Sequence, residues 1–347
     1  MTGKRIMLIG DFGRSAFGAP YYNTNFALHA GFVRAGCHVM PFSDRDVARE
    51  ASIVGRKTLG RGAMNRALVA TAKAYRPHLV LFGHADMTEP ETFDAIRAAV
   101  PGVRLAQFNV DALFRTETMA RFRNRATHVD ISFITTAAPE RLRALGAKPH
   151  SIAYFPNLVD AAIAVRDLST VARADAAYDG IFLGTGIERR ADQARGLSAA
   201  LPSEFRFLAA GGVLDTPRLS GPNYLETLAS GTMSPNLPLD DTLPVDFLYS
   251  SDRIAHLLVH GIVPFCPYGS RLDSLYDDGV ILYTSLEELA DQMAALAGDD
   301  ARRRRIGATG RRIGLERTSA ERVARYMLDL TLGSGPSADY GWPSDLI

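Results

Sequence analysis

The chain repeats one pattern along most of its length: a short, continuous run of apolar residues, then a stretch whose apolar residues recur at helical spacing. Early examples of the apolar runs are residues 4–10, 37–43 and 78–84. A strand that is apolar throughout is buried on both faces, whereas a half-exposed strand alternates apolar and polar residues. Such strands joined by helices predict a parallel sheet covered by helices on both sides, the Rossmann-like layout.

The pattern is interrupted at residues 161–178, which lack a strong strand signal, and it restarts at IFLGT (181–185). A chain of 347 residues is long enough for two domains. We therefore predict an α/β protein with two Rossmann-like domains facing across a cleft where a ligand binds. The predicted ranges are 1–160, 161–330 and a tail, 331–347, that either packs back on the first domain or is mobile.

Composition excludes several kinds of partner. The formal net charge is +1, so no global field attracts nucleic acid or an anionic membrane. Two distant cysteines, Cys37 and Cys266, provide neither a disulfide framework nor a metal-ligand spacing. A strand pattern begins at once, leaving no room for a signal peptide, and no apolar stretch approaches the roughly 20 residues that span a bilayer. These features predict a cytoplasmic protein without a transmembrane segment, metal or nucleic-acid partner.

One predicted helix carries an unusual polar stripe. In SSDRIAHLLVHGIVPFCP (250–267), Arg253, His256 and His260 share one helical face. We expect Arg253 to point into the cleft and bind an anion, although pairing with a surface carboxylate is the alternative. For His256, binding a ligand hydroxyl and hydrogen bonding in the core are equally open. For His260, beside Gly261, we expect a role in the core.

Two loops of the second half have the character of anion sites. FLGTGIERR (182–190) places glycines after a strand and arginines at a helix start, where backbone N–H groups and guanidinium groups bind phosphate. The loop PYGSR (267–271) opens another helical turn. Each loop is equally consistent with an ordinary connection. The candidate residues are Gly184, Thr185, Gly186, Arg189, Ser270 and Arg271.

The first half offers candidates for acid–base chemistry. His84, Asp86 and Asp111 follow two predicted strands, and the carboxyl ends of parallel strands are where open α/β sheets bind ligands. The alternative for an aspartate there is a helix cap. The glycine-rich loop GDFGRSAFG also places Gly13 and Arg14 at a strand end, as candidates to line the cleft. Its spacing is not the dinucleotide fingerprint, which disfavours a nicotinamide enzyme.

Residues 150–330 resemble the C-terminal domain of GT-B glycosyltransferases, particularly the CgeB-like, spore-maturation type of the glycosyl transferases group 1. FLGTGIERR is similar to the family segment F-V-G-S-x-x-x-E-R, and FPNLVD (155–160) to L-P-N-G-V-D. The helix at 250–261 is similar to S-x-R-x-F-E-A-L-A-x-G, and 272–275 parallels the next segment. The positions that fit the helix are Ser251, Arg253, Leu258 and Gly261.

The resemblance implies a hexosyltransferase-like enzyme of polysaccharide or glycoconjugate synthesis. It moves a sugar from a nucleotide-diphosphate sugar to a hydroxyl of a glycan, protein or small-molecule acceptor, without a metal or other cofactor. Arg253, Arg189 and the loop amides then stabilise the leaving diphosphate. His84 or Asp111 orients or deprotonates the acceptor hydroxyl.

The chain departs from the family at two positions. Glutamates are usual where it has Leu248 and His256, and the second is taken to hold the donor ribose. Two alternatives follow: a non-catalytic relative that binds a sugar or nucleotide, and a sugar-nucleotide epimerase of the same architecture. Slow donor hydrolysis separates an enzyme from the first, and turnover without an acceptor identifies the second.

Overall fold

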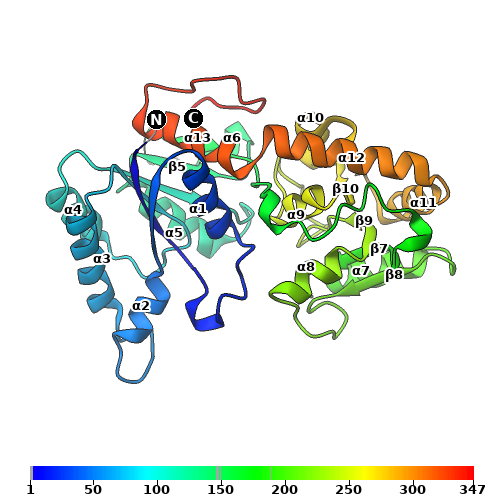
Figure 1. Ribbon diagram of the computed structural model, residues 1–347, viewed down its shortest axis with the longest axis horizontal. Helices are drawn as coiled ribbons and strands as arrows, with labels where there is room; N and C mark the ends of the chain where they lie inside the picture. Colours follow the sequence, from blue (N-terminus) through cyan, green and yellow to red (C-terminus); the bar gives the residue numbers. More distant parts are fainter. Residues whose placement is uncertain (1–2, 146–147, 149, 188) are drawn as a thin grey trace. The chain divides into compact units, whose positions relative to one another are not determined.

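A computed structural model describes residues 3–145, 148, 150–187 and 189–347. The chain divides into two compact units (Figure 1). The first unit contains Met1–Pro156 together with Ala320–Ile347, and the second contains Asn157–Ser319. Each unit is built around one parallel sheet, as the continuously apolar strands predict.

The sheet of the first unit has six strands in the order β2-β1-β3-β4-β5-β6. The central strand β3 is buried along its whole length, with the sequence LVLF. The strand order reverses at β1, which pairs with β2 on one side and β3 on the other. The strands are β1 (Arg5–Ile9), β2 (His38–Phe42), β3 (Leu79–Phe82), β4 (Arg104–Asn109), β5 (Ile131–Ile134) and β6 (Ile152–Tyr154).

Helices connect these strands and bury one face each against the sheet. The first begins after Asn23, whose side chain accepts hydrogen bonds from the N–H groups of Asn25 and Phe26 and so caps the helix start. Buried side chains of Phe82 and Phe93 join strand and helix in one core cluster. The helices are α1 (Thr24–Arg34), α2 (Asp44–Glu50), α3 (Arg61–Tyr75), α4 (Pro90–Ala99), α5 (Thr116–Ala126), α6 (Pro139–Arg143) and the 3-10 turn η1 (Arg14–Ala16).

The last helix, α13 (Ala320–Leu332), belongs to the first unit, where it lies beside α1 (Figure 1). Gly31 explains the contact, because a Cβ atom there would stand 2.2 Å from the carbonyl oxygen of Ala320. The final residue, Ile347, pairs with Ile152 through backbone hydrogen bonds of 2.8 and 3.2 Å. The boundary at 330 expected from the sequence therefore differs from the structure, in which the chain returns to the first unit at residue 320.

The sheet of the second unit has five strands in the order β11-β10-β9-β7-β8. Its order reverses at β7, which pairs with β8 and β9. The strands are β7 (Tyr178–Leu183), β8 (Phe207–Ala210), β9 (Gly231–Pro235), β10 (Val263–Pro267) and β11 (Ile281–Tyr283). The helices are α7 (Arg190–Ala200), α8 (Pro222–Leu228), α9 (Arg253–Val259), α10 (Asp273–Tyr276), α11 (Leu286–Ala297) and α12 (Asp300–Arg317), with 3-10 turns at Ala161–Ile163, Arg173–Asp175, Tyr268–Ser270 and Asp277–Gly279.

The prediction of two Rossmann-like α/β domains is confirmed by these two parallel sheets. Both cysteines are buried and free. Within the described part of the chain, no helix is both long enough and apolar enough to span a bilayer.

Candidate functional site

Arg253 lies where an open parallel sheet is expected to bind a ligand. It is the first residue of α9, and its guanidinium reaches the carboxyl ends of two neighbouring strands. Nη1 donates to the carbonyl oxygen of Leu183 at the end of β7, at 3.2 Å, and Nη2 donates to Oδ1 of Asn236 after β9, at 3.0 Å. The strand order reverses between these strands, and such reversal points open a crevice for ligands.

The charge of Arg253 is buried without a counter-charge. Its relative exposure is 4%, and its hydrogen-bond acceptors are neutral oxygens. The guanidinium stacks over the ring of Phe182 at 4.6 Å, and its Nε has no hydrogen-bond partner. Among the described residues no carboxylate forms an ion pair with it. Burial lowers the pKa of Arg253. An uncompensated buried cation is costly, so the arrangement favours binding of an anion.

Gly184 makes room for this guanidinium. A Cβ atom at residue 184 would lie 3.2 Å from Nη1 of Arg253 and 2.9 Å from Cζ of Phe182. The N–H of Gly184, however, donates to Ala210 O at 3.0 Å, and the N–H of Gly186 donates to Gly212 O at 2.9 Å. The prediction that these two amides hold a phosphate therefore differs from the structure, in which they donate to the last residue of β8 and to the loop that follows it. Thr185 lies between them and is partly buried.

Asn236 organises the surroundings of Arg253. Its Nδ2 donates to Oγ of Ser250 at 2.8 Å, and its Oδ1 accepts from Ser251 at 3.3 Å as well as from Arg253. Asn236 is 6% exposed and follows β9 directly. The sequence interpretation missed this residue, although it meets the criterion applied to His84: a polar side chain at the end of a buried strand.

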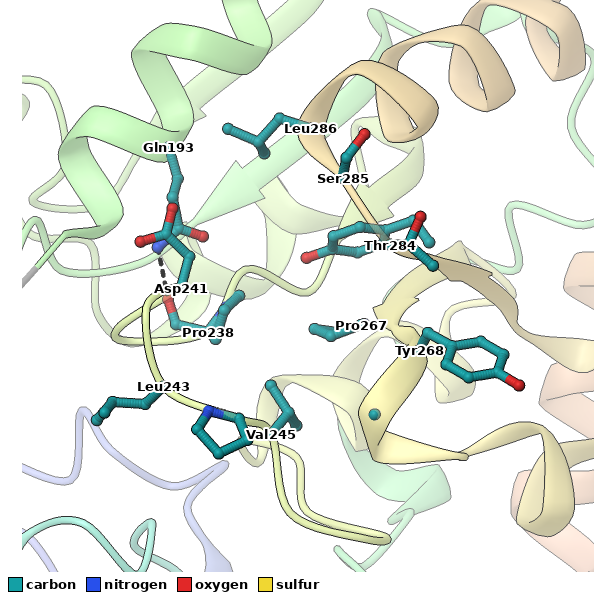
Figure 2. A pocket seen from close by; sticks show the side chains of 13 residues that line it. Gln193, Pro238, Asp241, Leu243, Val245, Pro267, Tyr268, Thr284, Ser285 and Leu286 are labelled. Atoms are coloured by element: carbon teal, nitrogen blue, oxygen red, sulfur yellow. Dashed lines mark hydrogen bonds between the residues drawn. The ribbon is translucent and has the colours of Figure 1, made fainter.

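A hollow of about 430 Å³ opens in the second unit beyond β10 and β11, within the size range of ligand pockets. Figure 2 shows Gln193 and Asp241 on one side of it and Thr284 and Ser285 on another. Nε2 of Gln193 donates to Pro238 O at 3.1 Å, the dashed line in Figure 2. The lining residues are Gln193, Pro238, Asp241, Leu243, Pro244, Val245, Pro267, Tyr268, Gly269, Tyr283, Thr284, Ser285 and Leu286.

Tyr283 gives this hollow a buried polar group. The residue is 6% exposed, and its hydroxyl has no hydrogen-bond partner. Burial raises the pKa of Tyr283, so the hydroxyl stays protonated and can donate. A smaller void lined by Asn236 and Ser250 shares Pro238, Val245 and Pro267 with the hollow. The smaller void therefore lies beside the hollow, and one of its lining residues, Asn236, is hydrogen-bonded to Arg253.

The other predicted donor-side cations are paired elsewhere. Arg189 is half exposed, and its Nε contacts Oδ1 of Asp241 at 2.5 Å. Arg271 is paired with Asp273 at 3.2 Å and lies 5.4 Å from the ring of Tyr268. Each therefore has a local carboxylate, as in the alternative interpretation of these loops as ordinary connections. Ser270 is fully buried, and its hydroxyl donates to Pro267 O at 2.7 Å within the turn.

The two histidines of α9 have different partners. His256 is 5% exposed, and its Nδ1 shares a hydrogen bond of 3.1 Å with the hydroxyl of Tyr224. His260 is fully buried: its Nε2 accepts from the N–H of Val165 at 3.1 Å, and its Nδ1 lies 2.7 Å from His256 O. Burial lowers the pKa of His260 to about 4, which keeps the ring neutral. The predicted core role of His260 is confirmed.

In the first unit, His84 and Asp111 come together at the ends of β3 and β4. Nε2 of His84 lies 3.7 Å from Oδ2 of Asp111, and each side chain is about one-third exposed. Burial lowers the pKa of His84, while Asp111 opposes this and Arg125 adds to it. Asp86 is engaged differently: it pairs with Arg45 at 2.8 Å. Burial acts to raise the pKa of Asp86, but the hydrogen bond and the charge of Arg45, with smaller contributions, together lower it.

Gly13 and Arg14 belong to a loop held by its own side chains. Gly13 has a positive φ of 62°, and its N–H donates to Oδ1 of Asp11 at 2.8 Å. Arg14 forms an exposed ion pair with Glu50 at 2.8 Å. These partners differ from the His84–Asp111 pair, so the structure does not gather all of the predicted first-unit residues into one cluster.

Comparison with known proteins identifies part of the chain. Residues 189–329 match the family model described as glycosyl transferase-like. A search of curated protein sequences found no significant match.

Several solved structures share the architecture over nearly the whole chain. Sucrose-phosphate synthase from Thermosynechococcus elongatus is 15% identical with a TM-score of 0.67, covering 94% of this chain and 98% of its own. HepE of Anabaena, solved with UDP and glucose, is 12% identical with a TM-score of 0.61 and the same coverage. The apo structure of OtsA is 9% identical with a TM-score of 0.59, covering 94% and 99%. The protein therefore has the GT-B fold of two Rossmann-like domains, and its residues 189–329 are similar to the glycosyl transferase-like family.

Proposed function

We propose that the protein is a glycosyltransferase that transfers a hexose from a uridine-diphosphate sugar to an acceptor hydroxyl, as a member of the CgeB-like group. The observation that carries the proposal is Arg253: a buried cation with neutral partners at the sheet position where α/β folds bind ligands. The family match over residues 189–329 supports the reaction class. Structures of HepE with UDP and with UDP-glucose support the choice of donor.

The donor is held by the second unit alone. The hollow near Tyr283 takes the nucleoside, because its walls are mostly apolar with a few polar groups. The diphosphate extends toward Asn236, which lines a smaller void of about 20 Å³, and this void widens on binding so that a phosphate reaches Arg253. Nε of Arg253, which has no hydrogen-bond partner among the described residues, then donates to a phosphate oxygen.

Arg253 also supplies the catalytic electrostatics. Cleavage of the sugar–phosphate bond leaves the nucleoside diphosphate with an additional negative charge. A fixed guanidinium in a dry site stabilises that charge without reorganising at the moment of reaction. In this proposal no metal ion is required, so the reaction should proceed unchanged after treatment with a chelator.

His84 acts on the acceptor in the first unit. Its lowered pKa keeps the imidazole neutral near pH 7, the form that can take a proton from a hydroxyl. Asp111, 3.7 Å from the ring, stabilises the imidazolium that then forms. The acceptor oxygen attacks the anomeric carbon of the sugar, the bond to the diphosphate breaks, and the hydroxyl proton ends on His84.

The decisive experiment is a calorimetric titration of UDP into the Arg253→Met and Arg253→Lys variants. Loss of the guanidinium should weaken UDP binding about a hundredfold in Arg253→Met, because a desolvated charge-assisted contact is worth about 3 kcal/mol. Arg271→Met is the matched control, since Arg271 is exposed and paired with Asp273. Unchanged affinity in Arg253→Met would remove the residue from the site.

Turnover assays separate this function from its alternatives. A glycosyltransferase releases UDP slowly from its donor in water and faster with an acceptor. An epimerase would convert the donor sugar without any acceptor, and a binding protein would leave the donor intact. Either of the last two results would overturn the proposed reaction while leaving the UDP site standing.

A further inference from the structure

The first unit contains a second hollow with the character of an anion site. Its volume is about 220 Å³, and it lies between the segment after β3 and helices α4 and α5. Arg61, Arg121 and Arg125 contribute to its wall, together with Asp86 as the carboxylate. Three guanidinium groups and one carboxylate therefore line the hollow.

Two of these arginines already have carboxylate partners. Arg61 lies 3.4 Å from Glu89, and Arg121 contacts Glu117 at 3.1 Å and Asp86 at 3.9 Å. Asp86 is itself held by Arg45 at 2.8 Å. The charges in this part of the wall are therefore paired with one another and do not require a ligand as counter-charge.

Arg125 differs from both. Its Nη1 donates to Gly83 O at 2.7 Å, and its buried Nε has no hydrogen-bond partner. No described carboxylate lies within ion-pairing distance of it. Burial lowers the pKa of Arg125 to about 10, which still leaves the guanidinium charged at neutral pH. Like Arg253, it is a cation without a bound counter-charge.

Thr88 supplies the second unsatisfied group. It is 8% exposed, it lines the same hollow, and its Oγ1 has no hydrogen-bond partner. A buried hydroxyl without a partner costs free energy unless something fills its hydrogen bond. Thr88 and Nε of Arg125 can both donate, so a ligand that accepts hydrogen bonds and carries negative charge satisfies them together.

We propose that this hollow binds the phosphate group of a small phosphomonoester. A phosphate dianion supplies the counter-charge that Arg125 lacks among the described residues, and its oxygens accept from Thr88 and Arg125 once these side chains turn toward it. The volume exceeds that of the phosphate alone, and Pro90 and Phe93 provide an apolar side for the organic part. All residues of this site belong to the first unit, whereas those of the proposed UDP site belong to the second.

The test titrates inorganic phosphate and methyl phosphate into the full-length protein at constant ionic strength. The Arg253→Met background removes the proposed diphosphate contact, so that binding reports the first unit. Saturable binding is expected. It should weaken about tenfold or more in Arg125→Met and severalfold in Thr88→Val, because each change removes a donor to a charged group. Arg123→Met, an exposed position of the same helix, should bind like the parent.

Thr88→Val distinguishes a ligand contact from a structural one. Since Oγ1 has no protein partner, valine should leave the melting temperature equal or higher while weakening phosphate binding. Equal phosphate affinity in all variants, absence of saturation, or acetate binding as tight as phosphate would overturn the proposal. UDP affinity measured with Arg253 intact should be unchanged in Thr88→Val, so failure here and failure of the UDP site are separate results.

Discussion

A buried charged side chain lies at each end of strand β7, and the two differ in whether an opposite charge pairs with them. At its beginning, Asp179 is fully buried and accepts from Arg173 at 2.7 Å and from Arg206 at 2.6 Å. At its end, Arg253 is nearly as buried, yet it contacts the neutral oxygens of Leu183 and Asn236. Arginines of the protein therefore neutralise the charge of Asp179, whereas among the described residues no carboxylate pairs with Arg253.

The difference separates a structural charge from a functional one. A buried ion stabilises a fold only when its counter-charge and hydrogen bonds come with it. Asp179 meets that condition, and its pKa shows it: burial acts to raise the pKa, but the hydrogen bonds from Arg173 and Arg206 hold it well below its usual range. Among the described residues Arg253 has no such counter-charge, and this is why the proposed function assigns it to the donor site.

The largest expected effect comes from removing the charge of Asp179 at the beginning of β7, where the ion pairs are complete. Asp179→Asn leaves Arg173 and Arg206 without their carboxylate and should lower the free energy of unfolding by about 3–5 kcal/mol. Urea denaturation at neutral pH measures it, with Asp175→Asn, an exposed neighbour, as the control. A loss below that of the control would refute the structural role of Asp179.

A third buried ionisable group, Asp44 in the first unit, can avoid the cost of a buried charge by taking up a proton. It is fully buried, Oδ1 has no partner, and burial together with the charge of Asp86 raises its pKa from 3.8 to about 6. A carboxyl whose pKa is higher in the folded state contributes stability that is complete below pH 4 and lost as the pH rises through 6.

Asp44→Asn removes this titration. Relative to the variant, the parent should lose up to about 3 kcal/mol between pH 4 and pH 8. The measurement is urea denaturation across this pH range, and Asp94→Asn on the exposed face of α4 serves as the control. If the free energy of unfolding varies with pH in the same way in the parent and in Asp44→Asn, the pKa of Asp44 is not raised and its carboxylate is ionised in the folded protein.

The smallest effect is expected at Arg189. This residue is half exposed and paired with Asp241, so its charge is already screened and compensated. Arg189→Ala should change UDP affinity by less than about twofold, because screened exposed pairs contribute little. A loss approaching that of Arg253→Met would restore Arg189 to the donor site and show that the pair with Asp241 opens on binding.

The sequence was sufficient to predict those features that depend on residues close together along the chain. The apolar run at 78–84 contains β3 (Leu79–Phe82). His84 and Asp111 were expected at the ends of two strands, and their side chains lie 3.7 Å apart. In each case the residues are close in sequence or are placed by the parallel sheet itself.

The sequence interpretation did not predict hydrogen-bond and ion-pair partners that are distant along the chain. The amides of Gly184 and Gly186 donate to carbonyl groups at the end of β8 and just after it, and residue spacing in a loop carries no information on which neighbour approaches it. Asp241, which pairs with Arg189, lies in another loop of the same unit. Asn236 and Thr88 stand out only when burial and missing hydrogen bonds are known.

The close contact between Gly31 and Ala320 has a consequence for synthesis. The second unit is one unbroken stretch of chain and can fold as soon as it leaves the ribosome. The first unit is interrupted, and α1 lacks its partner α13 until the whole second unit has been translated. The unit that begins first is therefore completed after the second, and a nascent chain stalled before residue 320 would expose the side of α1 that α13 later covers.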